Sequence, residues 1–117
     1  MQRTELLKGT LDLLLLRTLE LGPRHGIGIA SRIARVTAGV FQVRPGSLFP
    51  ALHRLEAEGF IAGEWTVSRL RRRVKTYRLT DAGRDQLTRE LDLWAKVALA
   101  VTQVLQTHDS DAEDDAE

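Results

Sequence analysis

Residues 45–80 read PGSLFPALHRLEAEGFIAGEWTVSRLRRRVKTYRLT, and this stretch decides the fold. Its first part predicts a helix that begins near Ser47, a good N-cap residue, and ends at Gly59. Two strand-like runs follow at 60–67 and 74–80, joined by the basic turn SRLRRR. The apolar residues that recur at helical spacing in the first part are Leu48, Leu52 and Leu55.

Two more helices are predicted before this stretch. The first begins at Thr4 or Thr10 and ends at the pair Gly22-Pro23, with leucines on nearly all of its sides. A helix that is apolar all round must be covered all round, either in the core or in a subunit interface. The second spans about 26–37, and 38–43 follows as a turn and a short extended piece. Three helices followed by a basic hairpin are typical of a winged helix-turn-helix domain, mainly α with a small β-hairpin.

A long last helix is predicted from the segment Thr80-Asp81-Ala82-Gly83 to about Gln106. A second apolar stripe runs beside its main seam, so one face can lie on its own domain and the other needs a partner. The sequence therefore divides into a winged-helix domain at 1–80, a dimerisation helix at 81–107 and an acidic tail at 108–117, predicted to be disordered. The main seam alternates steps of four and three residues through Leu87, Leu91, Trp94, Ala98, Val101 and Leu105.

Composition narrows the class of protein. The chain has 117 residues, the length of one domain, with 43% hydrophobic and 28% charged residues, which is typical of a globular protein. It has no cysteine, which excludes disulfides and thiolate chemistry. The apolar run 13–16 is too short to span a bilayer and has no signal-peptide context, so a cytoplasmic location is expected.

The net charge of +1 conceals an asymmetry along the chain. Residues 1–80 carry 14 Lys or Arg against 6 Asp or Glu, a net charge of +8. Residues 81–117 carry 3 against 10, a net charge of −7. A basic body with an acidic end favours a polyanionic partner for the first part, and an ordinary solvated surface is the alternative interpretation.

The helix that begins near Ser47 and the basic hairpin are the candidate DNA-binding elements. In a helix-turn-helix the second helix of the motif reads bases in the major groove, and a wing contacts phosphates or enters the minor groove. Arg54 can pair with guanine, although it can instead pair with Glu58 four residues later, and Ser47 can be only a cap. The predicted DNA contacts are Arg44, Ser47, Phe49, Pro50, His53, Arg54, Arg69, Arg71, Arg72, Arg73 and Lys75.

Several blocks, LKGTLDLLLLRTLELGPRHGIGIASRI, GSLFPALHRLEAEGFI and KTYRLTDAGR among them, resemble the PadR transcription regulators over roughly residues 6–95. With one helix after the wing, the chain is similar to the short subfamily. The resemblance implies a winged helix, a dimer formed mainly through the first and last helices, and repression of a nearby promoter. It places 69–75 in the wing. Phe49 and Ile27 stand where the family usually has tyrosine, which removes two hydroxyls and predicts a shift of DNA contacts toward arginines.

A homodimer and a small-molecule effector are expected from the same resemblance. Some short-subfamily members bind flat aromatic or cationic drugs between protomers through an aromatic residue of the last helix. Trp94 lies at a similar place, so it is a candidate for contact with a planar apolar effector, and burial in the core is the alternative. Trp65 is interpreted as a packing residue only. The predicted dimer interface comprises Leu11, Leu15, Leu87, Leu91, Trp94, Ala98, Val101 and Leu105.

No enzyme, cofactor or metal site is predicted. His25, His53 and His108 are scattered and fit no metal-ligand spacing, and the sequence has no nucleophile–base motif or glycine-rich phosphate loop. The competing hypothesis is a winged-helix module that binds small molecules or proteins without reading DNA. A salt titration of duplex binding separates the two, because phosphate contacts give a steep salt dependence.

Overall fold

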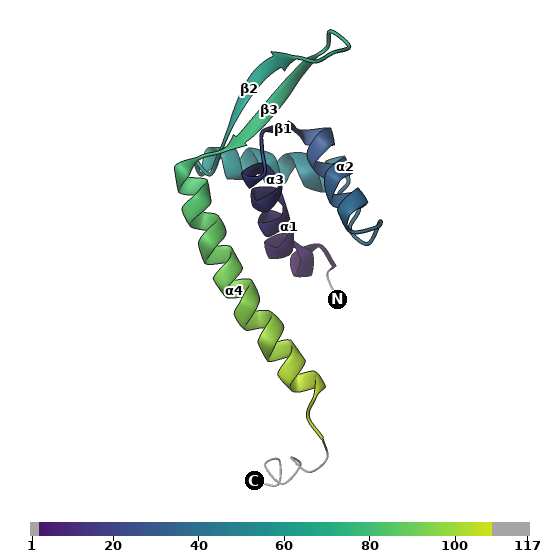
Figure 1. Cartoon of the computed structure of the whole chain (residues 1–117), viewed down its shortest axis with the longest axis vertical. Coiled ribbons are helices and arrows are strands. Elements are labelled where there is room, and N and C mark those ends of the chain that lie inside the picture. Colours follow the sequence, from purple (N-terminus) through teal and green to yellow (C-terminus); the bar gives the residue numbers. More distant parts are fainter. Residues whose placement is uncertain (1–2, 109–117) are drawn as a thin grey trace.

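The computed structural model describes residues 3–108, so 109–117 of the predicted acidic tail lie outside the described residues. The fold is mainly helical with a small sheet, as predicted. In Figure 1 the helices that precede the hairpin are gathered into a body, the hairpin projects from it, and the last helix extends away from it. Within residues 3–108, no helix has both the length and the apolar character needed to cross a membrane. The elements are α1 (Arg3–Glu20), β1 (Arg24–His25), α2 (Gly26–Val36), α3 (Pro45–Ala57), β2 (Ile61–Val67), β3 (Arg73–Leu79) and α4 (Asp81–Leu105).

The predicted hairpin is present, but the sheet has a third strand that was not predicted. The strands are antiparallel in the order β1-β3-β2. The β2–β3 ladder runs from Ile61 opposite Leu79 to Val67 opposite Arg73. Strand β1 adds Arg24 opposite Tyr77, and at two residues it is too short to show an alternating pattern. It fixes the start of α2 against the base of the hairpin.

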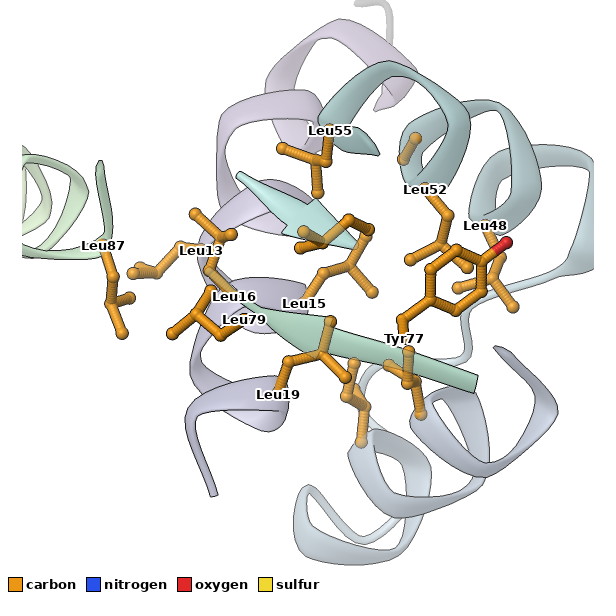
Figure 2. Packing of buried hydrophobic residues seen from close by; sticks show 14 residues of the cluster. Leu13, Leu15, Leu16, Leu19, Leu48, Leu52, Leu55, Tyr77, Leu79 and Leu87 are labelled. Carbon is orange, nitrogen blue, oxygen red and sulfur yellow. The ribbon is translucent and has the colours of Figure 1, made fainter. Parts of the chain in front are cut away.

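The core lies where α1, α2, α3 and the base of the sheet meet. Figure 2 shows the Tyr77 ring of β3 pointing toward Leu48 and Leu52 of α3, and Leu87 of α4 pointing toward Leu13 of α1. Burying a leucine stabilises the fold by roughly 1.5–3 kcal/mol relative to leaving it exposed. The fully buried side chains are Leu15, Leu16, Ile29, Leu48, Leu52, Leu55, Ile61 and Leu87.

The segment between α2 and α3 begins with a hydrogen-bonded turn, as predicted, and the short piece that follows it forms no strand. The N–H of Gly39 donates to the carbonyl of Ala34 at 2.7 Å, which closes the end of α2. Both Ala38 (φ 51°) and Gly39 (φ 83°) lie in the left-handed region. The Thr37 hydroxyl accepts from the N–H of Phe41 at 3.1 Å and donates back into α2. Side-chain bonds of this kind stabilise a turn at the end of a helix.

Helix α4 begins where the sequence predicted and is fixed to the turn that follows α3. The Thr80 hydroxyl accepts from the N–H of Gly83 at 3.0 Å and donates to the carbonyl of Gly59 at 2.6 Å. The N–H of Thr80 donates to the carbonyl of Phe60 at 3.1 Å. A Cβ on Gly83 would lie 2.0 Å from that same carbonyl oxygen, so only glycine fits at this contact.

Replacing Gly83 with alanine is expected to destabilise the fold by about 1–3 kcal/mol, because the methyl group would displace backbone rather than a flexible side chain. Urea unfolding at one fixed protein concentration measures the effect, since dimerisation would make the midpoint depend on concentration. Gly46→Ala is the matched control, because a Cβ there meets nothing within 4 Å. Equal midpoints for the two variants would contradict the close approach of α4 to Phe60.

Candidate nucleic-acid interface

Helix α3 buries one face and presents the other to solvent. Leu48, Ala51, Leu52 and Leu55 lie in the core. Its N-cap residue is Arg44, with extended backbone and no side-chain cap, so the predicted capping role of Ser47 is wrong. Ser47 lies within the first turn, where its side chain is exposed. The start of a helix attracts anions, and α3 presents its start uncapped. The exposed predicted contacts here are Arg44, Ser47, Phe49, Pro50 and His53.

Phe49 joins α3 to the start of α2. A Cβ on Gly26 would lie 2.8 Å from a ring carbon of Phe49, so the aromatic ring packs directly over the backbone at that glycine. The ring of Phe49 remains 36% exposed, and Ile27, the residue after Gly26, is 56% exposed. Phe49 therefore positions the two helices relative to each other while one edge stays open to solvent.

Arg54 is held within the chain. Its Nη2 donates to Oδ1 of Asp12 on α1 at 2.5 Å, and its Nη1 lies 3.6 Å from Oε1 of Glu58. The hydrogen bond to Asp12 is the main reason that the pKa of the Arg54 guanidinium is raised above its ordinary value. The alternative interpretation, a pair with Glu58, is present in the structure. The stronger partner, Asp12, is 42 residues away, a separation no local pattern reveals. Arg54 therefore fastens α3 to α1.

Lys75 is also paired internally. Its Nζ donates to Oε1 of Glu56 on α3 at 2.8 Å and lies 5.5 Å from the centre of the Tyr77 ring. Oε2 of Glu56 accepts from the N–H of Gly63 on β2 at 3.1 Å. The bond from Lys75 lowers the pKa of the Glu56 carboxyl, and the Gly63 N–H adds to the effect, while burial opposes it. These bonds join α3 to both β2 and β3.

Replacing Glu56 with glutamine is expected to lower the urea midpoint near pH 7 and to have a smaller effect near pH 3. The pKa of Glu56 is lowered by folding from its ordinary 4.5, so its charge stabilises the fold above that pH. This contribution disappears as the pH falls through the lowered value. Glu64→Gln, at an exposed position of β2, is the control. A difference between Glu56→Gln and the wild type that persisted unchanged near pH 3 would contradict a charge-dependent role.

The wing consists of β2, β3 and the turn between them, and the arginines of this turn are exposed to solvent. Arg69, Arg71 and Arg72 are exposed, and no ion pair joins them to an acid among the side chains described, those of residues 9–108. The guanidinium of Arg73 lies 4.9 Å from the centre of the Trp65 ring. Trp65 is 59% exposed, so its interpretation as a packing residue only is wrong. Its ring lies beside Arg73 at the surface, where one strand of a hairpin has no second layer to pack against.

Arg24, which lies opposite Tyr77 of β3, is a further cation that was not among the predicted DNA contacts. Its Nε is buried and has no hydrogen-bond partner among the described residues. It lies in β1, directly before His25, whose Nδ1 accepts from the N–H of Gly28 at 3.1 Å and caps α2. Arg24 could have been noticed in the sequence because it is a basic residue just before the start of α2. Helix starts are common binding sites for phosphate.

The predicted dimer residues fall into two groups. Leu15 and Leu87 are buried in the core of the chain itself, so they support α1 and α4 from within. Beyond Leu87, α4 leaves the body (Figure 1). Most of its apolar side chains there are exposed in a single chain. Leu11 is partly covered by the core and Ala98 is half-buried. The large side chains exposed along α4 are Leu91, Leu93, Trp94, Val97, Leu99, Val101, Val104 and Leu105.

A groove of about 1030 Å3 is lined by α1, by α3 and by the turn that follows α2. Leu11, Leu14 and Phe41 lie on its wall together with the Asp12–Arg54 pair, and Trp94 does not.

Comparison with known proteins agrees with this geometry. Residues 15–89 match the sequence profile described as "Transcriptional regulator PadR-like family". A transcriptional regulator of Mycobacterium tuberculosis is 41% identical over 66 residues, which are 56% of this chain and 58% of that protein. A PadR family transcriptional regulator from Eggerthella lenta is similar in structure, with a TM-score of 0.77 and 30% identity over 89% of this chain and 88% of that chain. A PadR-like regulator from Bacillus cereus has a TM-score of 0.75 and 28% identity over 89% of this chain and 99% of that chain.

Proposed function

The chain belongs to the PadR-like family of transcriptional regulators, and from this membership we propose that it binds double-stranded DNA sequence-specifically as a homodimeric repressor. It acts in the cytoplasm, on the chromosome. Residues 1–80 bind DNA and 81–107 hold the two protomers together.

The observation that carries this proposal is the set of unpaired arginines on the wing. Arg54 and Lys75 are neutralised by carboxylates inside the chain, whereas Arg69, Arg71 and Arg72 have no such partner among the described residues. Like charges gathered on a short turn repel one another, and a phosphate backbone compensates them. The wing follows directly after α3, so both elements can engage one duplex, the helix in the major groove and the wing beside it.

Base recognition is assigned to the exposed face of α3. Ser47 and His53 can hydrogen-bond to base edges or phosphates, and Pro50 offers an apolar contact near the start of the helix. Arg44 precedes the helix and can reach a phosphate. Reading of guanine by Arg54 would require release of its bonds to Asp12. The internal pairing of Arg54 therefore favours a supporting role, with selectivity supplied by the residues nearer the start of α3.

The homodimer is supported by the uncovered apolar side of α4. Leu91 is 45% exposed and Val101 is 52% exposed in a single chain. A second copy of α4, related by two-fold symmetry, would cover this side and place the two α3 helices on the same side of a duplex. Recognition helices of such a dimer contact successive major grooves, roughly 34 Å apart.

A planar apolar effector is proposed to bind beside Trp94. The ring is 48% exposed in a single chain, and the small residues Ala95 and Ala98 flank it on α4. A ligand there would change the angle between the α4 helices and weaken the fit to DNA, so the operator would be released by a population shift. Titration of Trp94 fluorescence with planar dyes in a Trp65→Phe background is expected to show quenching. No quenching by any dye at high micromolar concentration would exclude the site.

A salt titration of binding to duplex DNA tests the proposed function. Affinity is expected to fall steeply with salt, because each neutralised phosphate releases counterions. Binding of proteins or small molecules with no binding of DNA at low salt would favour the competing hypothesis of a winged helix that does not read DNA.

A further inference from the structure

The tip of the wing is a closed, hydrogen-bonded turn. The N–H of Ser68 donates to the carbonyl of Arg72 at 2.9 Å, and the N–H of Arg71 donates to the carbonyl of Ser68 at 2.9 Å. The Ser68 hydroxyl accepts from the N–H of Arg72 at 3.2 Å. Arg71 has φ 60°, the left-handed position that a three-residue hairpin loop requires and that glycine usually occupies. These bonds fix the three-residue loop 69–71 as a defined projection.

Leu70 stands in the middle of this loop and is 78% exposed. It is not part of the core cluster, and a large apolar side chain in water adds nothing to folding. Its neighbours in the sequence are Arg69 on one side and Arg71, Arg72 and Arg73 on the other. The arginines of this loop can bind an anionic surface, and the leucine at its apex can enter an apolar layer beneath that surface. The stacked interior of a duplex beneath its phosphates fits this description.

We propose that Leu70 enters the minor groove of bound DNA and partly unstacks one base step, while the flanking arginines hold the phosphates on both sides. The proposal rests on the DNA binding proposed above. Leucine is among the side chains that act as wedges between base steps, and the narrow minor groove attracts arginine. The wing then contributes to selectivity as well as affinity, because the energy of deforming a step depends on its sequence.

This role predicts a particular pattern in the preferred sites. Pyrimidine–purine steps such as TA and CA are the most easily unstacked. A dimer carries two wings, so two such steps are expected at symmetry-related positions flanking the bases that α3 reads. At these positions the wild type is expected to prefer a flexible step over a stiff A-tract step by on the order of tenfold.

Selection from a pool of random 40-base-pair duplexes tests the proposal, with the wild type, Leu70→Ala and Val67→Ala as proteins. Val67 is the matched control, because it is an apolar wing residue that is 69% exposed and lies on β2 away from the apex. Wild type and Val67→Ala are expected to enrich flexible steps at the two flanking positions. Leu70→Ala is expected to select the same central bases and to lose the flanking preference.

A second measurement follows the unstacking itself. 2-Aminopurine placed at the selected flanking step of a duplex brightens when the base is unstacked, so wild-type protein is expected to raise its fluorescence and Leu70→Ala is not. Equal flanking preferences and equal fluorescence for the two proteins would overturn the wedge and leave DNA binding intact. Failure of every protein to select any duplex would instead overturn the proposed function, and the wedge with it.

Discussion

The variant that carries Leu91→Asp and Val101→Asp is expected to be a monomer at micromolar concentration and to lose operator binding. Neither residue belongs to the core, so the body of the chain should keep its fold. Both lie on the apolar side of α4, where a partner helix would otherwise remove them from water. An unpaired carboxylate buried in an apolar interface costs several kcal/mol, and a dimer would contain four of them. The expected loss of self-affinity is therefore at least a thousandfold.

Sedimentation measures the oligomeric state, and circular dichroism confirms that the helices remain. Thr88→Asp with Gln103→Asp is the matched control, because it adds the same charge to the same helix at exposed positions away from the apolar seam. This control is expected to remain a dimer. A double aspartate variant at 91 and 101 that stays as tight a dimer as the control would exclude α4 as the main interface.

The helices and the hairpin could be predicted from the sequence because their signals are local. Leu48, Leu52 and Leu55 repeat at helical spacing, and all three are buried in the structure. Thr80 caps α4 with its own hydroxyl, as its position before an apolar repeat indicates. In each case the residues that decide the element lie within one or two turns of each other, so a single sequence suffices.

Contacts between distant residues could not be predicted in this way. Asp12 and Arg54 meet only because α1 and α3 share a core, and nothing in either segment indicates the other. The same holds for Glu56 and Lys75, which join a helix to a strand. Charge patterning counted Arg54 and Lys75 among the cations available to DNA, whereas the three-dimensional structure shows that carboxylates already hold them. Arg69, Arg71 and Arg72, also predicted DNA contacts, lie on the turn of the wing and are exposed, because no second layer of protein covers this turn.

The apolar pattern of α4 fits two roles, packing against the chain's own core and packing against a partner. The seam of α4 runs without a break from Leu87 to Leu105, yet Leu87 belongs to the core and Leu105 is 77% exposed. Spacing alone cannot show where the chain's own body stops covering a helix. The structure places that point between Leu87 and Leu91, and the assignment of the remaining residues to a partner stays a prediction.

Removal of two wing arginines, Arg71→Ala with Arg72→Ala, is expected to weaken binding to the operator and to random duplex DNA alike. Each phosphate contact contributes about 0.9 to the slope of log affinity against log salt, so the slope should fall by about two. At about 0.1 M salt this corresponds to an affinity loss of several tens of fold on both DNAs. The effect is uniform because phosphates carry no sequence information.

The geometry of the turn makes a sharper version of this experiment possible. Arg71 occupies a left-handed position, so Arg71→Gly should relieve strain and raise the free energy of unfolding by about 1 kcal/mol while it removes one phosphate contact. A variant that is more stable and yet binds DNA with a slope lower by about one separates charge from folding. Arg84→Ala with Arg89→Ala, on α4, removes two exposed cations outside the wing and is expected to keep the original slope. If the wing variants keep that slope and the α4 variant loses it, the phosphates are bound by another face of the protein.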